Sequence, residues 1–118
     1  NKLVVNCVVN PLTAILRVRD NEIVTEALKE VRHGIIDECV RVGRAEGMVF
    51  EPDLKELIDK NILRYTNFSS MCQDLMRGKR TEIDFLNGKI VELGRRHHIP
   101  TPINETLVSL IKSLEAKQ

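Results

Sequence analysis

Polar side chains gather at two expected helix starts in the middle of this 118-residue sequence. Ser70 and Thr81 each precede a helical apolar pattern, so each is placed to cap a helix N-terminus. Free N–H groups and the partial positive charge of a helix start favour a small anionic ligand. Glu82 points to a different role, because a carboxylate is a hydrogen-bond acceptor or a base. Donors beside one fixed carboxylate therefore predict a ligand that carries both a carboxylate and a hydroxyl.

A second polar cluster lies at the N-terminal end of the sequence. Lys2, Asn6 and Asn10 recur every four residues, which places them along one face of a helix. The amides could be a buried, satisfied pair that ties the helix to a neighbour. Their shared face with a lysine favours a binding site instead.

Residues 2–16 can be interpreted as a strand or as a helix. Val4, Val5, Val8 and Val9 favour a strand by propensity. However, apolar residues occupy all of the circumference outside the polar face, which is typical of a buried helix. We therefore predict a helix, which Pro11 should kink or end because it has no N–H for the carbonyl of Cys7.

Aliphatic residues at spacings of three and four predict further helices and an all-α domain of about six or seven helices. The spacing also predicts a buried core, made of Leu28, Ile35, Ile58, Leu86, Ile90, Leu107 and Ile111. The expected boundaries are a helix over 21–46, broken near Thr25 and stopped by Gly47; one from Pro52 to about Tyr65; one from Met71 to Arg77; one entered through a Thr81–Asp84 capping box; and one with Thr101 as N-cap and Pro102 as first residue.

Composition restricts the class of protein. Hydrophobic residues make up 42% and charged residues 30%, with a net charge of +1, which indicates a globular domain that binds neither nucleic acid nor a membrane. The three widely spaced cysteines predict free thiols in a reducing, cytoplasmic location. His, Cys, Asp and Glu residues show no metal-ligand spacing, so no metal site is expected.

Ordered sequence blocks carry a resemblance to a known family. They are Lys2-Leu3-Val4-Val5-Asn6-Cys7-Val8-Val9-Asn10-Pro11-Leu12-Thr13-Ala14, Ser69-Ser70-Met71-x-Gln73-Asp74, Thr81-Glu82-Ile83-Asp84-x-x-Asn87-Gly88 and Pro100-Thr101-Pro102-x-Asn104. Over essentially its whole length, the chain resembles the C-terminal domain of ketopantoate reductase, also called 2-dehydropantoate 2-reductase. The resemblance implies an all-α fold similar to the C-terminal domain of 6-phosphogluconate dehydrogenase.

The resemblance also implies roles for individual residues. Lys2 would be the general acid that protonates the C2 oxygen, and Glu82 would be a catalytic carboxylate that hydrogen-bonds the substrate and orients the site. The implied substrate-binding residues are Asn6, Asn10, Asn67 and Ser70.

The family implies partners outside the chain. NADPH would be bound mainly by an N-terminal Rossmann domain, for which this sequence has no G-x-G-x-x-G motif. We therefore interpret the chain as a fragment, which should be inactive alone, and expect the full-length enzyme to make pantoate for pantothenate and coenzyme A. A second copy of the chain is a candidate partner, as a homodimer.

Two other functions fit the same residues. The fold could act on a different 2-oxo acid, because a lysine beside an anion site serves any such acid. The chain could instead be a helical dimerisation or interaction module without chemistry.

Overall fold

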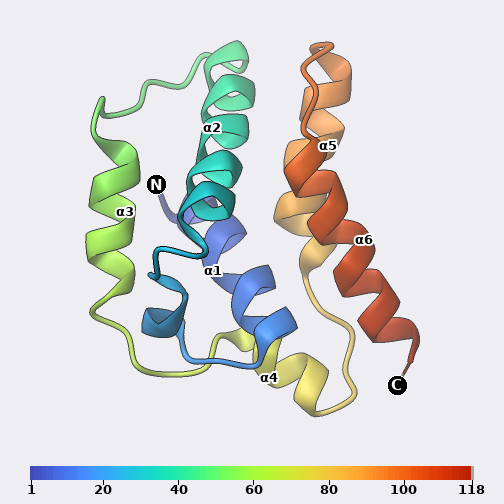
Figure 1. The fold of residues 1–118 in the computed structure, drawn as a ribbon. Coiled ribbons are helices and arrows are strands. Elements are labelled where there is room, and N and C mark those ends of the chain that lie inside the picture. The colour runs from blue at the N-terminus through green and yellow to red at the C-terminus, as the bar shows by residue number, and fades with distance from the viewer. Residues whose placement is uncertain (118) are drawn as a thin grey trace.

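Six α-helices and two short 3-10 helices make up the computed structural model, which describes residues 1–117 (Figure 1). In chain order the elements are α1 (Lys2–Leu16), η1 (Asp20–Ile23), α2 (Lys29–Ala45), α3 (Leu54–Ile62), α4 (Ser70–Met76), η2 (Ile83–Phe85), α5 (Asn87–Arg96) and α6 (Pro102–Ala116). Residues 1–117 contain no β-strand. The predicted all-α fold is confirmed, and residues 2–16 form a helix.

The first helix, α1, is the centre of the fold and contacts α2, α3, α4, α6 and η1. In Figure 1 it lies between α2 and α3 on one side and α5 and α6 on the other. Asn1 caps it, since the side-chain oxygen accepts hydrogen bonds from the N–H groups of Leu3 (3.1 Å) and Val4 (3.3 Å). Neighbours on most sides explain why α1 is apolar around most of its circumference.

The proline inside α1 does not end the helix, which continues from Pro11 to Leu16. Of the two predicted outcomes at Pro11, a kink or a helix end, the helix end is therefore wrong. Pro11 leaves the carbonyl of Cys7 without its usual helical donor. Asn87 of α5 replaces that donor, because its Nδ2 lies 2.9 Å from the Cys7 oxygen. A side chain 80 positions away thus satisfies the backbone group that the proline leaves unpaired.

A buried polar network connects this point to two other helices. Glu38 of α2 accepts hydrogen bonds from the N–H groups of Ile103 (2.9 Å) and Asn104 (3.0 Å) and from the Asn104 side chain (2.8 Å). Asn104 in turn accepts one from Asn87, at 2.9 Å. Thr101 precedes α6 as predicted, but its side chain makes no capping bond. The Glu38 carboxylate takes over that function at the start of α6.

The second predicted helix is interrupted more completely than expected. Residues 20–23 form η1, and α2 begins only at Lys29. Arg32 donates to the carbonyl oxygens of Ile23 (2.9 Å) and Thr25 (2.7 Å). These carbonyls therefore bind a side chain and not the backbone N–H groups of a helix. Leu28 precedes α2 and is only half-buried, whereas the other six predicted core residues are buried. The structure also corrects α3, which begins after Pro52 and ends before Tyr65.

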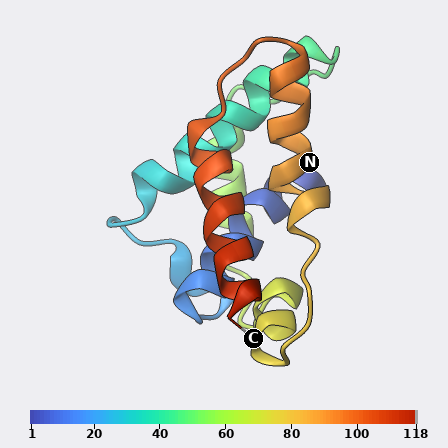
Figure 2. The ribbon, with the colours of Figure 1, turned by 90° about the vertical axis from the view of Figure 1, so that its right-hand side faces the viewer.

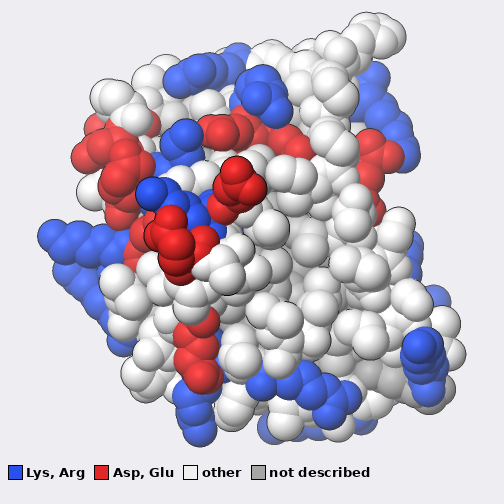
Figure 3. Space-filling model, in the orientation of Figure 1, with Lys and Arg blue, Asp and Glu red and all other residues white. Residues whose placement is uncertain are grey.

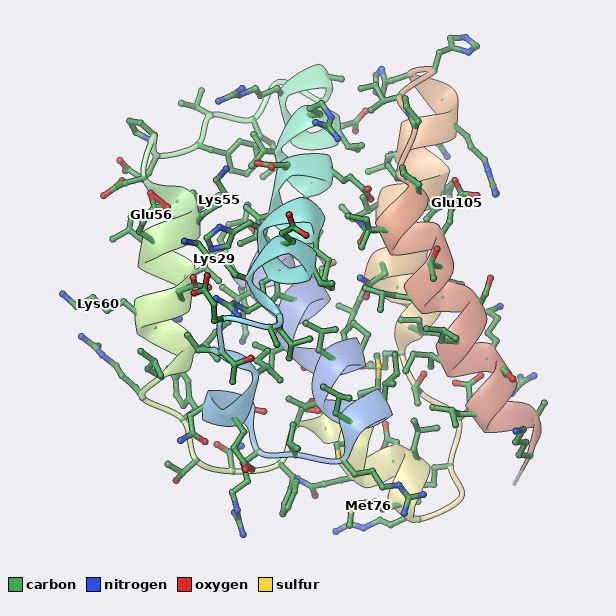
Figure 4. All side chains as sticks on the ribbon, in the orientation of Figure 1. Lys29, Lys55, Glu56, Lys60, Met76 and Glu105 are labelled. Atoms are coloured by element: carbon green, nitrogen blue, oxygen red, sulfur yellow. The ribbon has the colours of Figure 1, made fainter. Side chains whose placement is uncertain are left out.

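An ion pair joins α2 to α3. Arg32 contacts both carboxylate oxygens of Asp59, at 3.0 and 3.1 Å, and His33 contacts the same group at 2.7 Å. Burial by itself raises the pKa of Asp59, but hydrogen bonds and positive charge from Arg32 and His33 outweigh it and hold the pKa below the ordinary 3.8. A second pair, Lys55 with Asp37 at 3.2 Å, is more exposed (Figure 4) and stabilises the fold less.

The lowered pKa of Asp59 predicts how the stability of the fold depends on pH. Asp59→Asn should reduce the free energy of unfolding by about 1.5–3 kcal/mol near neutral pH, as for a hydrogen bond to a charged group. A carboxyl whose folded pKa is depressed stabilises the fold above the unfolded pKa of 3.8, and this contribution disappears as pH falls through the folded pKa. The difference between variant and wild type should therefore shrink below about pH 4 in urea titrations. Asp53→Asn, at an exposed carboxyl with no capping bond, is the control and should show no such trend.

The surface shown in Figure 3 is unevenly charged. Lys, Arg, Asp and Glu gather over α2 and α3, whereas the centre of this face, between α1 and α6, carries few charges. An apolar groove of about 380 Å³ lies among these helices, and its walls include Ile15, Leu28, Val31, Ile103 and Leu110. Within residues 1–117, none of the helices has both the length and the apolar character that crossing a membrane requires.

Candidate functional site

A cavity of about 620 Å³ lies beside the N-terminal part of α1. All six residues singled out from the sequence line it: Lys2, Asn6, Asn10, Asn67, Ser70 and Glu82. They come from α1, from the start of α4 and from the segment before η2, so three distant parts of the chain meet here. Figure 2 shows the last of these segments, which runs from α4 near the bottom of the view up to the start of α5.

The first helix supplies one wall of the cavity through Lys2, Asn6 and Asn10. Lys2 is exposed and the two asparagines are half-buried. Within residues 1–117, none of the three side chains forms a hydrogen bond or ion pair. The alternative in which Asn6 and Asn10 tie α1 to a neighbouring helix is therefore wrong. Their amide groups remain available to a ligand.

The start of α4 supplies a second wall. Its N-cap is Ser69 and not the predicted Ser70, because the Ser69 hydroxyl accepts the N–H of Cys72 at 3.1 Å. Ser69 is buried and also shares a hydrogen bond of 2.7 Å with Thr13 of α1, which fixes α4 against α1. Ser70 is the first helical residue and is exposed at the cavity. The cap and the candidate ligand-binding serine are thus two different residues.

The segment around Glu82 closes a third side of the cavity. The predicted Thr81–Asp84 capping box does not form: Thr81 uses its N–H and its hydroxyl to bind Glu115 of α6, at 2.8 and 2.6 Å. The chain after Thr81 makes the 3-10 helix η2 before α5 begins at Asn87. Glu82 itself is exposed, and its carboxylate has no partner within residues 1–117.

The cavity therefore combines the ammonium group of Lys2, several neutral donors, the exposed carboxylate of Glu82 at its rim and the carboxyl of Asp20 in its wall. An ammonium group can donate a proton or balance a negative charge. Amide and hydroxyl donors can bind a carboxylate, while Glu82 can accept a hydrogen bond from a ligand hydroxyl. Such a set suits a small acid that has a second oxygen function.

Sequence reasoning missed other residues of the cavity wall. The polar ones are Asn1, Asp20, Asn61, Tyr65 and Ser69, and the apolar ones are Val5, Val9 and Leu86. Asn61 lies in the last turn of α3 and Tyr65 lies in the loop that follows, so helical spacing does not connect them. Asp20 likewise had no signal in the sequence, because its place depends on contacts with a distant segment.

The cysteines do not contribute a nucleophile to the cavity. All three are free and buried. A hydrogen bond with Cys39, together with burial, raises the pKa of the Cys7 thiol, and burial raises that of Cys72. Both thiols are therefore neutral near pH 7 and weakly reactive. Among residues 1–117, no group of three His, Cys, Asp or Glu side chains could hold a metal ion.

The sequence of this chain is similar to those of known proteins. Residues 1–115 match the family described as the ketopantoate reductase PanE/ApbA C-terminal domain. The 2-dehydropantoate 2-reductases of Archaeoglobus fulgidus and Vibrio cholerae are 40% and 38% identical to it over 116 residues, which are 98% and 97% of this chain and 39% of each relative. The chain thus spans about two-fifths of the length of these curated relatives.

Solved structures show the same similarity. A PanE/ApbA family ketopantoate reductase from Ralstonia eutropha JMP134 has a TM-score of 0.91 and 39% identity, over 98% of this chain and 40% of that one. A D-mandelate dehydrogenase with NADH and anilino(oxo)acetate also has a TM-score of 0.91, at 27% identity, over 98% of this chain and 50% of that one. With a family match along almost its whole length, the chain belongs to the ketopantoate reductase C-terminal domain family.

Proposed function

We propose that this chain is the substrate-binding and catalytic half of an NADPH-dependent 2-dehydropantoate 2-reductase, which converts ketopantoate to pantoate for pantothenate and coenzyme A. One observation carries the proposal: three distant segments bring a lysine, amides, a serine and a glutamate to one cavity, and the amide and ammonium groups of α1 have no partner within residues 1–117. The names of its relatives supply the reaction.

In this proposal the residues divide the work between proton transfer and binding. Lys2 donates a proton to the C2 oxygen as the carbonyl becomes a hydroxyl. Asn6 and Asn10 hold that oxygen and the lysine in place from the same helix face. Glu82 accepts a hydrogen bond from the substrate hydroxyl and so fixes its orientation. The hydride that completes the reduction comes from NADPH when the cofactor is bound.

Two polar groups at the start of α4 bind the part of the substrate that does not react. Ser70, with Asn67 nearby, donates hydrogen bonds to the substrate carboxylate in this proposal. Both side chains are exposed at the cavity, and neither forms a strong bond elsewhere in residues 1–117, since Asn67 only reaches the oxygen of Phe68 at 3.4 Å.

The nucleotide is expected on an N-terminal Rossmann domain in the remaining part of the protein. A Rossmann site needs a parallel sheet, and residues 1–117 contain no strand. The residues of this chain fit the other half of the task, because Lys2 and Glu82 lie exposed at the cavity and leave it open to a second domain. The chain alone is therefore expected to be inactive. We further propose a cytoplasmic protein, with a second copy of the chain as a candidate partner.

Turnover by the full-length protein tests the proposal. We expect reduction of ketopantoate with NADPH, slower reduction with NADH, and poor reduction of unbranched 2-oxo acids. The 118-residue chain alone serves as the negative control. Failure of the full-length protein to reduce any 2-oxo acid would favour the helical interaction module, which predicts that Lys2, Asn10 and Glu82 can be replaced without effect on any reaction.

A second candidate is the same reaction on a different 2-oxo acid. The structural similarity to D-mandelate dehydrogenase, whose structure holds anilino(oxo)acetate, favours this alternative. A higher kcat/KM for an aromatic 2-oxo acid than for ketopantoate would select it.

The serine at the start of α4 gives a specific prediction. In the full-length protein, Ser70→Ala should raise KM by roughly 10–100-fold and leave kcat nearly unchanged. It removes one hydrogen bond, worth about 1.5–3 kcal/mol, to a carboxylate that does not react. Steady-state kinetics would measure both constants. Ser109→Ala, an exposed serine of α6 that does not line this cavity, is the matched control. A fall in kcat at constant KM would contradict the assignment.

A further inference from the structure

A buried carboxyl, Asp20, lies in the wall of the candidate site. It is the first residue of η1, and only 8% of its surface is exposed. Its oxygen Oδ1 has no hydrogen-bond partner within residues 1–117. A carboxylate in such a place is costly, because burial removes water and no donor replaces it. An unpaired carboxyl at a ligand cavity therefore needs an explanation.

The backbone around Asp20 holds it at the cavity. Its N–H donates to the carbonyl of Asn67 (3.0 Å), and the N–H of Asn21 donates to that of Tyr65 (2.9 Å). Arg19 adds a third bond, from Nη1 to the carbonyl of Thr66 at 2.8 Å. This segment leads directly into the serines of α4. These bonds fix the backbone of Asp20 beside one wall of the site.

The charged and titratable groups around Asp20 come from several elements. Those that share its cavity are Lys2 of α1, Tyr65 of the loop after α3 and Glu82 before η2. Arg17, directly after α1, and the thiol of Cys72 in α4 are also nearby. Burial is the main cause of the raised pKa of Cys72, while the charge of Arg17 lowers this pKa and that of Asp20 raises it. The wall from α3 contributes only the neutral Asn61. The Arg19 guanidinium is occupied by Thr66 and lies 4.5 Å above the Phe68 ring.

We propose that a 2-oxo acid anion binds in this cavity only when the Asp20 carboxyl is neutral, so that substrate binding is coupled to the uptake of one proton by Asp20. This inference rests on the proposed function. Two carboxylates in one site repel each other. A neutral carboxyl removes that repulsion, and its O–H can donate a hydrogen bond to a substrate oxygen. The proton comes from the solvent and returns to it when the product leaves.

The coupling predicts the direction in which substrate affinity changes with pH. Burial raises the pKa of Asp20 above its ordinary value of 3.8, and a bound anion would raise it further. Below the pKa of the free site, Asp20 is already neutral and the affinity for the substrate does not depend on its titration. Between the free and the bound pKa, each pH unit should weaken binding by up to about tenfold.

Asp20→Asn in the full-length protein tests the coupling, because asparagine has the same shape, stays neutral and keeps a donor. We would measure the KM of ketopantoate from about pH 5 to about pH 9 for both proteins. The ratio of wild-type to variant KM should rise with pH, by up to about tenfold per unit. Lys2 and Glu82 are present in both proteins, so their contributions cancel in this ratio. Asp53→Asn, at an exposed carboxyl outside the cavity, is the matched control and should behave as wild type.

Calorimetry provides a measurement that does not depend on turnover. Ketopantoate would be titrated into the full-length protein with NADP⁺ in two buffers of different ionisation enthalpy. We expect the wild type to take up as much as one proton more than Asp20→Asn. A KM ratio that is constant with pH, or equal proton uptake by both proteins, would overturn the inference while ketopantoate reduction still stands. If the variant does not fold, absence of proton uptake by the wild type overturns it. Loss of every 2-oxo acid activity in the wild type would instead overturn the proposed function, and this inference with it.

Discussion

Lys2→Ala in the full-length protein is expected to lower kcat by a factor of about 10²–10⁴, the usual contribution of a general acid. The effect should fall on kcat more than on KM, because the proton is transferred in the transition state. The lysine is the first residue of α1, and its ammonium group has no competing partner within residues 1–117. Steady-state kinetics at saturating NADPH would measure the loss.

Two further variants separate proton donation from charge. Lys2→Arg keeps the positive charge but replaces the ammonium with a group that does not release its proton. A general acid therefore predicts a low kcat for Lys2→Arg also. Lys60→Ala is the control, because this exposed lysine of α3 points away from the body of the molecule (Figure 4). Wild-type kcat in Lys2→Ala would remove the lysine from the mechanism.

Glu38→Ala should be the most destabilising single change in the buried network, with a loss of about 3–5 kcal/mol in the free energy of unfolding. The substitution leaves three donors without an acceptor: the N–H groups of Ile103 and Asn104 and the Asn104 side chain. Only 2% of Glu38 is exposed, so water cannot easily replace the carboxylate. Urea titration followed by circular dichroism would measure the change.

The neighbouring Asp37 provides a matched control on the same helix. Its ion pair with Lys55 is about half exposed, with 47% of the Asp37 side chain accessible. Asp37→Ala should therefore cost about 1 kcal/mol or less. The loss in Glu38→Gln should lie between those of Glu38→Ala and Asp37→Ala, because one oxygen remains as an acceptor. The new NH₂ group faces a backbone N–H, so two donors meet without an acceptor. Equal losses for the Glu38 and Asp37 variants would contradict the role of the network.

Local sequence patterns were sufficient to predict most helices, whereas their first turns depended on distant contacts. Ser69 and Ser70 are equally good caps by type, and the hydrogen bond of Ser69 with Thr13 of α1 distinguishes them. Thr81 has the sequence of a capping residue, but Glu115 of α6 binds its hydroxyl. Such pairs lie 34 or more positions apart. Periodicity within one helix cannot show them.

The candidate site was predictable to the extent that its residues lie in short motifs. The spacing of Lys2, Asn6 and Asn10 indicated one face, and the structure places that face at the cavity. The resemblance, and not spacing, connected it with Ser70, Asn67 and Glu82. Asp20 could not be found in either way, because its burial follows from pairing between η1 and residues 65–67.

The hydrogen bond between Asn87 and the carbonyl of Cys7 has a consequence for how the sequence can change over time. Proline at position 11 leaves the Cys7 carbonyl without its helical donor, and asparagine at position 87 supplies another donor. The residue that is favourable at position 87 therefore depends on the residue at position 11. An Asn87 substitution would leave the Cys7 carbonyl without a donor only while Pro11 is present, whereas the Asn104 oxygen would lose its donor in either case. A lineage that regains an N–H at position 11 could lose Asn87 at lower cost. The two residues should therefore be exchanged together more often than separately, although they belong to different helices.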